Sequence, residues 1–284
     1  GQQEPLGATP AWAMDPKRLR GLIRQRRSVV GYDRGADISR EQLFAVLRAA
    51  MPEQEPLASL TPFARPLVPL VMLSVQRVEG LAPGLYALVR DTSRLAWLRS
   101  EACCRRHYLW APVEGCPDEL PLLALTFGNF EGVMETAALG QPIARDGAVA
   151  AVIFAEYEPA LRESGAWLYR RLLWEACAVG HAFWLAAEAV GLRAGAIGAF
   201  VGPWTHDVLG IDGCELRDAY HFTFGVPARV APYGDNSEFR PPYEHLGHFR
   251  SRRDRDAVDT REWKIADIHM LGQTMQRTGM PCCW

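Results

Sequence analysis

The part of this sequence that most constrains its fold is the stretch from Arg170 to Phe200. It is apolar at nearly every position up to Gly191-Leu192, which predicts one long helix. A helix that is hydrophobic on nearly every face lies inside a protein or between subunits rather than on a wet surface. The next residues, Ala194 to Gly198, predict a strand with almost no side-chain bulk, which another backbone or a flat ligand can approach closely.

Composition narrows the class of protein. The chain has 284 residues, of which 49% are hydrophobic, and this is ample for a buried core in one large domain or two small ones. The formal net charge of -2 provides no basic excess to neutralise phosphates, so we expect no nucleic-acid partner. Spanning a bilayer takes roughly 20 apolar residues. The longest apolar stretch is interrupted by Glu175, His181 and Glu188, so we expect no membrane partner either.

Cysteine usage and the N-terminal residues favour a cytoplasmic protein. The seven cysteines include the adjacent pairs Cys103-Cys104 and Cys282-Cys283, and they lack the spacing of a secreted disulfide framework. Residues 1–10 are polar and contain proline, unlike a signal peptide. His245 and His248 have a metal-like spacing, but a structural zinc site normally takes four ligands and the sequence holds no compact set of four. We therefore predict no metal.

Hydrophobic runs between turn residues predict one α+β domain over residues 15–228. Ser39 and Gln42 have the spacing of a capping box at the start of a helix. Residues 1–14 are predicted to be a disordered leader, and residues 229–284 an extended C-terminal arm, in which 231–262 hold few aliphatic side chains. The predicted strands cover residues 67–75, 87–90, 120–127, 148–154, 194–198 and 220–225, and shorter helices are predicted at 17–26, from 39 onward and through 141–144.

An ordered set of segments resembles the SagB and thiazoline-oxidase branch of the nitroreductase superfamily. No single motif is specific to this branch, but the whole set in this order is specific. Together the segments cover roughly residues 15–228. The match is closest to the second half of longer members that carry two such domains in tandem. The segments are Ile23–Ser28, Val78–Tyr86, Tyr169–Glu175, Leu185–Leu192, Ala196–Gly198, His206–Gly210 and Tyr220–Gly225.

The resemblance implies a nitroreductase-like α+β fold, with a central mixed or antiparallel sheet flanked by helices. Such proteins are usually dimers, or internal pseudo-dimers, with FMN bound between the two halves. The cofactor carries two-electron transfer, while the protein supplies position and electrostatics. Members of this branch often oxidise azolines in modified peptides to azoles. For this chain the resemblance implies FMN, a small-molecule or peptide substrate, and either a homodimer or a heterodimer with a related chain.

Two segments are candidates for holding the cofactor. Arg26, Arg27 and Ser28 suit a phosphate, because guanidinium groups pair with phosphate oxygens in a bidentate manner and the hydroxyl adds a donor. The alternative is a solvated basic helix end, where cations are stabilising in their own right. The second segment consists of Gly195, Ala196, Ile197 and Gly198. It could present backbone N–H groups to the edge of the flavin ring, or it could simply be a buried strand with tight helix packing. The two interpretations are compatible.

The candidates for catalysis are Glu163, His181 and Tyr169. Glu163 stands in the predicted loop 162–165, where azoline oxidases of the family have a Lys-Tyr pair thought to help remove a substrate proton. It could act as a base if it were buried, and is otherwise a solvated side chain. His181 could hydrogen-bond flavin or substrate, or cap a neighbouring carbonyl in the core. Tyr169 could donate a proton or be an ordinary buried tyrosine.

Several other polar residues that the family has at its site are replaced in this chain. Ser164 stands beside Glu163 at the Lys-Tyr position, and Ala199 occupies a position where relatives tend to have cysteine. The glycine-histidine and glutamine-asparagine pairs of the central helix are here Cys177-Ala178 and His181-Ala182. Two functions therefore stay open. One is an FMN-dependent oxidoreductase acting on a small molecule or a peptide-borne heterocycle, and the other is a degenerate partner or scaffold subunit of a biosynthetic complex.

Overall fold

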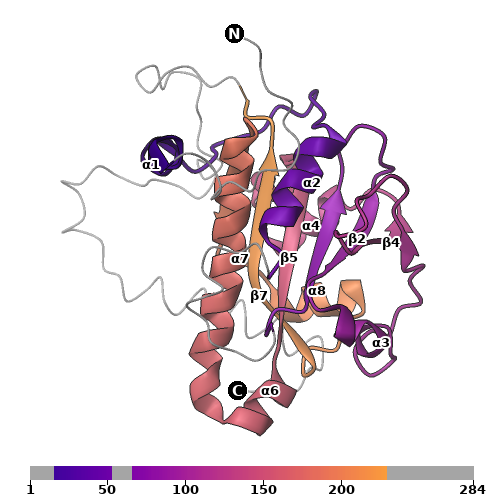
Figure 1. Cartoon of the computed structure of the whole chain (residues 1–284). Coiled ribbons are helices and arrows are strands. Elements are labelled where there is room, and N and C mark those ends of the chain that lie inside the picture. Colours follow the sequence, from indigo (N-terminus) through magenta and orange to yellow (C-terminus); the bar gives the residue numbers. More distant parts are fainter. Residues whose placement is uncertain (1–15, 53–65, 229–284) are drawn as a thin grey trace, which may run out of the picture. The chain divides into compact units, whose positions relative to one another are not determined.

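The computed structural model describes residues 16–52 and 66–228 (Figure 1). The predicted leader, 1–14, and the predicted arm, 229–284, lie outside these residues, and so do His245 and His248 with their metal-like spacing. Within the described part the expected α+β fold is confirmed, because an antiparallel sheet carries helices on its faces. No helix there is long and apolar enough to cross a membrane.

The strands and helices follow one another along the chain largely as the hydrophobic pattern predicts. The described helices are α1 (Pro16–Gln25), α2 (Arg40–Ala49), α3 (Leu95–Leu98), α4 (Glu131–Ala137), α5 (Pro142–Asp146), α6 (Glu158–Ser164), α7 (Tyr169–Ala189) and α8 (Gly202–Leu209). The strands are β1 (Leu70–Val75), β2 (Gly84–Val89), β3 (Ala111–Pro112), β4 (Leu122–Phe127), β5 (Val149–Glu156), β6 (Arg193–Ile197) and β7 (Leu216–Gly225). Short 3₁₀ turns, Thr92–Arg94 and Ala166–Leu168, precede α3 and α7.

The start of α2 confirms the capping box. The Ser39 side chain accepts from the backbone N–H of Gln42 at 3.2 Å, and the Gln42 side chain accepts from the backbone N–H of Ser39 at 2.9 Å. Two backbone donors that the first helical turn leaves unpaired are thereby satisfied. The Gln42 amide also donates to the carbonyl of Val190 at 2.9 Å, which ties α2 to the end of α7.

The sheet has the order β3-β4-β2-β1-β5-β7-β6, and every neighbouring pair is antiparallel. Its middle strands β1, β2 and β5 are buried at every position, which requires cover on both faces. Helices α2 and α7 pack over one face, and α5 and α8 contact β7 from the other (Figure 1). The glycine-containing strand β6 lies at one edge of the sheet, and β7 is its neighbouring strand.

A buried ion pair attaches the inner face of α7 to the sheet. The Glu175 carboxylate lies 3.1 Å from Arg90 Nη1, and both side chains are almost fully buried. The same carboxylate accepts from the backbone N–H groups of Leu67 and Val68, each at 2.9 Å in its shorter contact. Arg90 in turn donates to the carbonyl of Ala50 at 2.7 Å. A charge that looks like an interruption of the apolar helix is thus an anchor between α7, β1 and α2.

The outer face of α7 is open in the described part of the chain. Trp174 is 55% exposed, and Cys177 and His181 are exposed as well. These positions follow one another at intervals of three and four residues, so they form one stripe along the helix. The expectation that α7 lies inside the protein or between subunits therefore holds for its inner face, and the outer face is exposed among the described residues.

Candidate functional site

The loop after α1 and the edge strand β6 lie side by side. The backbone N–H of Val29 donates to the carbonyl of Ala194 at 3.1 Å. Gly195 lies against the same residue, since a Cβ added there would stand 2.8 Å from Val29 Cγ1. These contacts bring the segment Arg26–Ser28 to β6, so both groups of predicted cofactor ligands belong to one region. The missing side chain of Gly195 serves packing within the chain, which is the alternative that the sequence left open.

Beyond this contact, β6 leaves backbone groups at the edge of the sheet. Ala194 points its carbonyl away from β7, and residues two apart in a strand face the same side, so the N–H and C=O of Ala196 face this edge too. Gly198, just past the strand, is exposed, and no atom other than its chain neighbours lies within 4 Å of the Cβ position it lacks. Ile197 instead turns into the core. The end of β6 therefore offers backbone donors to a flat ring.

Arg26 is half-buried and only partly satisfied. Its guanidinium carbon lies 3.8 Å from the centre of the Trp184 ring on α7, a cation–π contact. Its Nη1 is buried and has no hydrogen-bond partner among the described residues. A buried donor without a partner is costly, whereas an anionic oxygen placed against it would form a strong charge-assisted hydrogen bond. This orphaned donor fits the phosphate of a nucleotide cofactor.

Arg27 and Ser28 have different surroundings. The Arg27 guanidinium folds back to donate to the carbonyls of Arg24 and Arg26, at 3.1 and 2.8 Å. It therefore stabilises the C-terminal end of α1, which is the alternative role considered for these arginines. Ser28 is exposed and directly precedes Val29, the residue that hydrogen-bonds to β6. A phosphate bound here would contact Arg26 directly. It could bind Arg27 only if the Arg27 guanidinium gave up its hydrogen bonds to the carbonyls at the end of α1.

His181 faces the same region from α7 and is exposed, so the alternative of a histidine capping a carbonyl in the core is wrong. Partial burial, together with the nearby charge of Arg26, lowers the pKa of its imidazole. It is therefore neutral at neutral pH and able either to donate or to accept a hydrogen bond. Glu188, about two turns further along α7, is paired with Arg193 of β6, and burial raises the pKa of its carboxyl.

Tyr169 and Glu163 lie at the opposite end of α7. Twelve residues separate Tyr169 from His181, which corresponds to about 18 Å along a helix axis. Glu163 is exposed in the last turn of α6, so the predicted loop at 162–165 is wrong for residues 162–164. Tyr169 is 44% exposed and packs edge-on against Tyr157, rather than being a buried tyrosine. The three predicted catalytic residues therefore do not converge within one chain, because His181 is more than three turns of α7 away from the other two.

Comparison with known protein families gives one match that covers most of this chain. The profile of the nitroreductase family matches residues 23–226, which cover most of the sequence and nearly all of the described fold. The chain belongs to the nitroreductase family. No curated protein matches it. Among the described residues of this nitroreductase-family chain, no group of three or more His, Cys, Asp or Glu side chains is placed to hold a metal ion.

Solved structures of the same family resemble the fold. A protein described as a nitroreductase of Anabaena variabilis is 25% identical, with a TM-score of 0.56 over 74% of this chain. The match spans only 39% of the Anabaena chain, so this chain covers well under half the length of that relative. A protein described as a nitroreductase of Ralstonia eutropha has 15% identity and a TM-score of 0.51, covering 81% of this chain and 89% of its own. A chain of the E. coli microcin synthetase McbBCD complex has 16% identity and a TM-score of 0.50, covering 82% and 76%.

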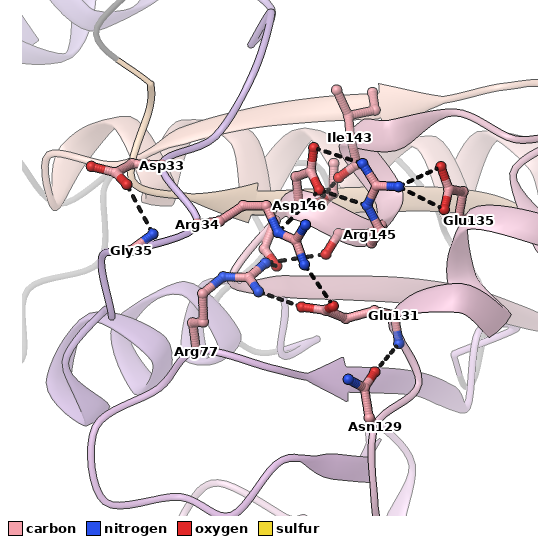
Figure 2. A network of polar contacts seen from close by, with 12 residues as sticks. Asp33, Arg34, Gly35, Arg77, Asn129, Glu131, Glu135, Ile143, Arg145 and Asp146 are labelled. Atoms are coloured by element: carbon pink, nitrogen blue, oxygen red, sulfur yellow. Dashed lines mark hydrogen bonds and ion pairs between the residues drawn. The ribbon is translucent and has the colours of Figure 1, made fainter.

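A network of alternating charges supports the α4–α5 segment of the nitroreductase fold (Figure 2). Arg34 contacts Glu131 at 2.9 Å, and Arg145 contacts Glu135 at 3.0 Å. Arg77 completes the network, donating to the carbonyl of Gly147 at 2.6 Å. In Figure 2 the three arginines each contact a carboxylate of this network, which suits a structural anchor better than a ligand site. The sequence gives no hint of this network, because its members come from four separated segments.

Sequence reasoning also missed the partners of Arg26. Trp184 and Glu188 follow His181 at intervals of three and seven residues, so all three share one stripe of α7. That spacing was available in the sequence and could have identified the helix face that receives the α1 loop. Val29 gave no such signal, because its role depends on where the loop meets an edge strand.

Proposed function

We propose that this chain binds FMN at the β6 edge and takes part in two-electron oxidation or reduction of an organic substrate. Bound there, the cofactor would supply the electron-transfer chemistry. The residues of this chain would hold it: Arg26 by its unpaired guanidinium donor, Ser28 by its hydroxyl, and the backbone at Ala196 and Gly198 by N–H groups. His181, neutral and exposed nearby, would hydrogen-bond the cofactor or the substrate.

The observation that carries this proposal is the hydrogen bond between Val29 and Ala194, 3.1 Å long. Arg26 and the glycine strand are separated by most of the domain in sequence, and this contact places both in one region. One of them contributes a cation with an unpaired donor, and the other contributes backbone groups beside open space. A nucleotide with an anionic end and a flat ring needs that combination of chemistry.

We propose further that a second chain completes the site across the outer face of α7. The exposed stripe of Trp174, Cys177 and His181 is continuous with the Arg26–Trp184 contact, so a partner on the stripe would also border the cofactor. The separation of Tyr169 and Glu163 from His181 supports the same arrangement. In an antiparallel pairing of two such helices, the far end of one α7 would approach His181 of the other.

The substrate class follows from the resemblance to the SagB and thiazoline-oxidase branch. We propose a small molecule or a heterocycle carried on a peptide, such as an azoline, in a natural-product pathway. The fold likeness to a chain of a microcin synthetase complex is compatible with that setting. Exposed Glu163 would need a partner chain to bury it before it could serve as a base, since full solvation leaves a carboxylate a weak one.

A second candidate function is a partner or scaffold subunit with no catalysis of its own. The separation of Glu163 on α6 and Tyr169 at the start of α7 from His181 favours it, as do the alanines at positions 182 and 199. In that case α7 would complete the flavin site of a related chain, and the β6 edge of this chain would hold no cofactor.

The visible absorption spectrum of the protein purified without added cofactor tests both functions. Flavin absorption, and release on heating of one FMN per chain, would support the proposed cofactor site. Arg26→Ala should then lower FMN occupancy strongly, whereas Arg24→Ala, which removes an exposed arginine two residues away, should leave it nearly unchanged. A colourless protein that takes up no added FMN would contradict the first function and favour the scaffold.

A further inference from the structure

A buried charged cluster lies beside the end of β6. Asp218 of β7 is 5% exposed, and its two carboxylate oxygens face two imidazoles. His206 Nε2 lies 3.0 Å from Oδ1, and His221 Nε2 lies 3.2 Å from Oδ2. Both histidines are buried, His206 on α8 and His221 opposite Ile197 of β6 in the register of the sheet. None of the three residues contributes to the cofactor site described above.

The cluster holds an ionised carboxylate in the core. Burial on its own raises the pKa of the Asp218 carboxyl, but hydrogen bonds from His206 and His221 outweigh that effect, so the pKa lies below its ordinary value. His221 Nε2 donates to the ionised carboxylate, and this charge-assisted hydrogen bond fixes the plane of the His221 ring. His206 Nε2 also accepts from the backbone N–H of Asp218 at 3.3 Å, which ties α8 to β7 at this point. Nδ1 of His221 is buried and has no hydrogen-bond partner among the described residues, which leaves Asp218 as the group that orients this ring.

The oriented ring of His221 carries an aromatic partner. Phe200 stacks on it face to face, with the ring centres 4.2 Å apart and the planes 5° from parallel. Phe200 belongs to the turn 198–201, which connects β6 to α8 and begins with the exposed Gly198. On its other side the turn is held by a hydrogen bond from the Gln141 side chain to the carbonyl of Ala199, 3.1 Å long.

We propose that Asp218, His221 and Phe200 are positioning residues that hold the turn 198–201 in its observed conformation. The carboxylate sets the plane of the His221 ring, the ring supports Phe200, and Phe200 fixes the backbone on either side of it. The turn follows directly on the proposed flavin-binding strand. The conformation of the turn would therefore determine the direction in which the N–H groups of Gly198 and Ala199 point. The consequence for the cofactor rests on the proposed function, whereas the effect on the turn does not.

The effect on the turn can be tested in the full chain without cofactor, by hydrogen exchange of its backbone amides. Phe200→Ala and His221→Leu should each speed exchange in residues 198–202 by about tenfold or more, as local opening becomes easier. Phe200→Tyr keeps the stack and should restore slow exchange. Trp97→Ala removes a ring on α3 that contacts Arg94 and takes no part in the His221–Phe200 stack, and it should leave these amides unchanged. Wild-type exchange rates in both Phe200→Ala and His221→Leu would overturn the proposal.

The consequence for the cofactor is tested with FMN itself as the probe. Phe200→Ala and Asp218→Asn should weaken FMN binding by about tenfold and change the shape of the bound flavin spectrum, as the loss of an orienting outer partner does elsewhere. Phe200→Tyr and Trp97→Ala should bind like wild type. Unchanged affinity in Phe200→Ala would overturn the positioning role while leaving FMN binding intact. If the wild type takes up no FMN, the proposed function fails, and hydrogen exchange alone decides the role of the cluster.

Discussion

The two faces of α7 differ in how completely the described chain satisfies them. On the inner face, Glu175 and Gly180 each have a specific neighbour: the charge meets Arg90 and two backbone donors, and the glycine makes room for Tyr220. On the outer face, Trp174, Cys177 and His181 are exposed. The contrast teaches that the inner face specifies the fold, whereas the outer face is exposed among the described residues and is the surface on which we propose that a second chain binds. Substitutions on each face should therefore have different consequences.

The largest effect is expected from Glu175→Ala. It would leave the Arg90 guanidinium in the core without its carboxylate and the N–H groups of Leu67 and Val68 without their acceptor. Breaking a buried pair in this way costs about 3–5 kcal/mol of unfolding free energy. Chemical denaturation measures it. As a control, Glu163→Ala on the exposed last turn of α6 should change stability by no more than about 0.5 kcal/mol. Equal losses in both variants would break the comparison.

On the outer face, Trp174→Ala should spare the fold and weaken association. We expect the subunit dissociation constant to rise about 30-fold, since central tryptophans of an interface contribute about 2 kcal/mol or more. Sedimentation velocity over a range of concentrations measures this change. Leu109→Ala removes a side chain that is 59% exposed but lies outside α7, and it should leave association unchanged. A wild-type protein that stays monomeric and binds no related chain would refute the proposed role of this face.

A smaller effect is expected at the closest approach of the inner face. A Cβ at Gly180 would stand 2.7 Å from the ring of Tyr220, so Gly180→Val must push the ring or the helix aside. Overpacking of this kind costs about 1–3 kcal/mol. Gly132→Ala in α4 is the matched control, because its Cβ has open space, and a helix gains about 1 kcal/mol from this replacement. Thermal unfolding of both variants should show shifts of opposite sign.

The smallest effect concerns the pH dependence of stability at His181. Its pKa is lowered in the folded chain, so between that value and about 6.5, the value expected for the unfolded chain, the unfolded state binds more protons. Folding is therefore weakened as pH falls through this window, and the deficit is absent above it. Replacing His181 with Gln should remove this contribution, seen as a flatter plot of unfolding free energy between pH 7.5 and 5.

Much of the fold could be predicted because its signals are local. Ser39 and Gln42 lie within one helical turn, and the apolar runs of β1 and β5 are continuous in sequence. Glu163 was misplaced because the short helix α6 has no apolar periodicity long enough to outweigh the nearby Gly165. Long-range features had no local signal at all. The joining of the α1 loop to β6 depends on which strand lies at the sheet edge, and topology decides that.

The two edges of the sheet differ in their capacity to recruit another strand. At one edge, β3 is only two residues long and contains Pro112, whose nitrogen carries no hydrogen, so further pairing is blocked. At the other edge, β6 is longer, and the α1 loop pairs with it at Ala194. A bound cofactor that occupies the backbone groups near Ala196 would shield that edge as well. Flavin supply during expression would then influence how much of the protein stays unaggregated, independently of any role in turnover.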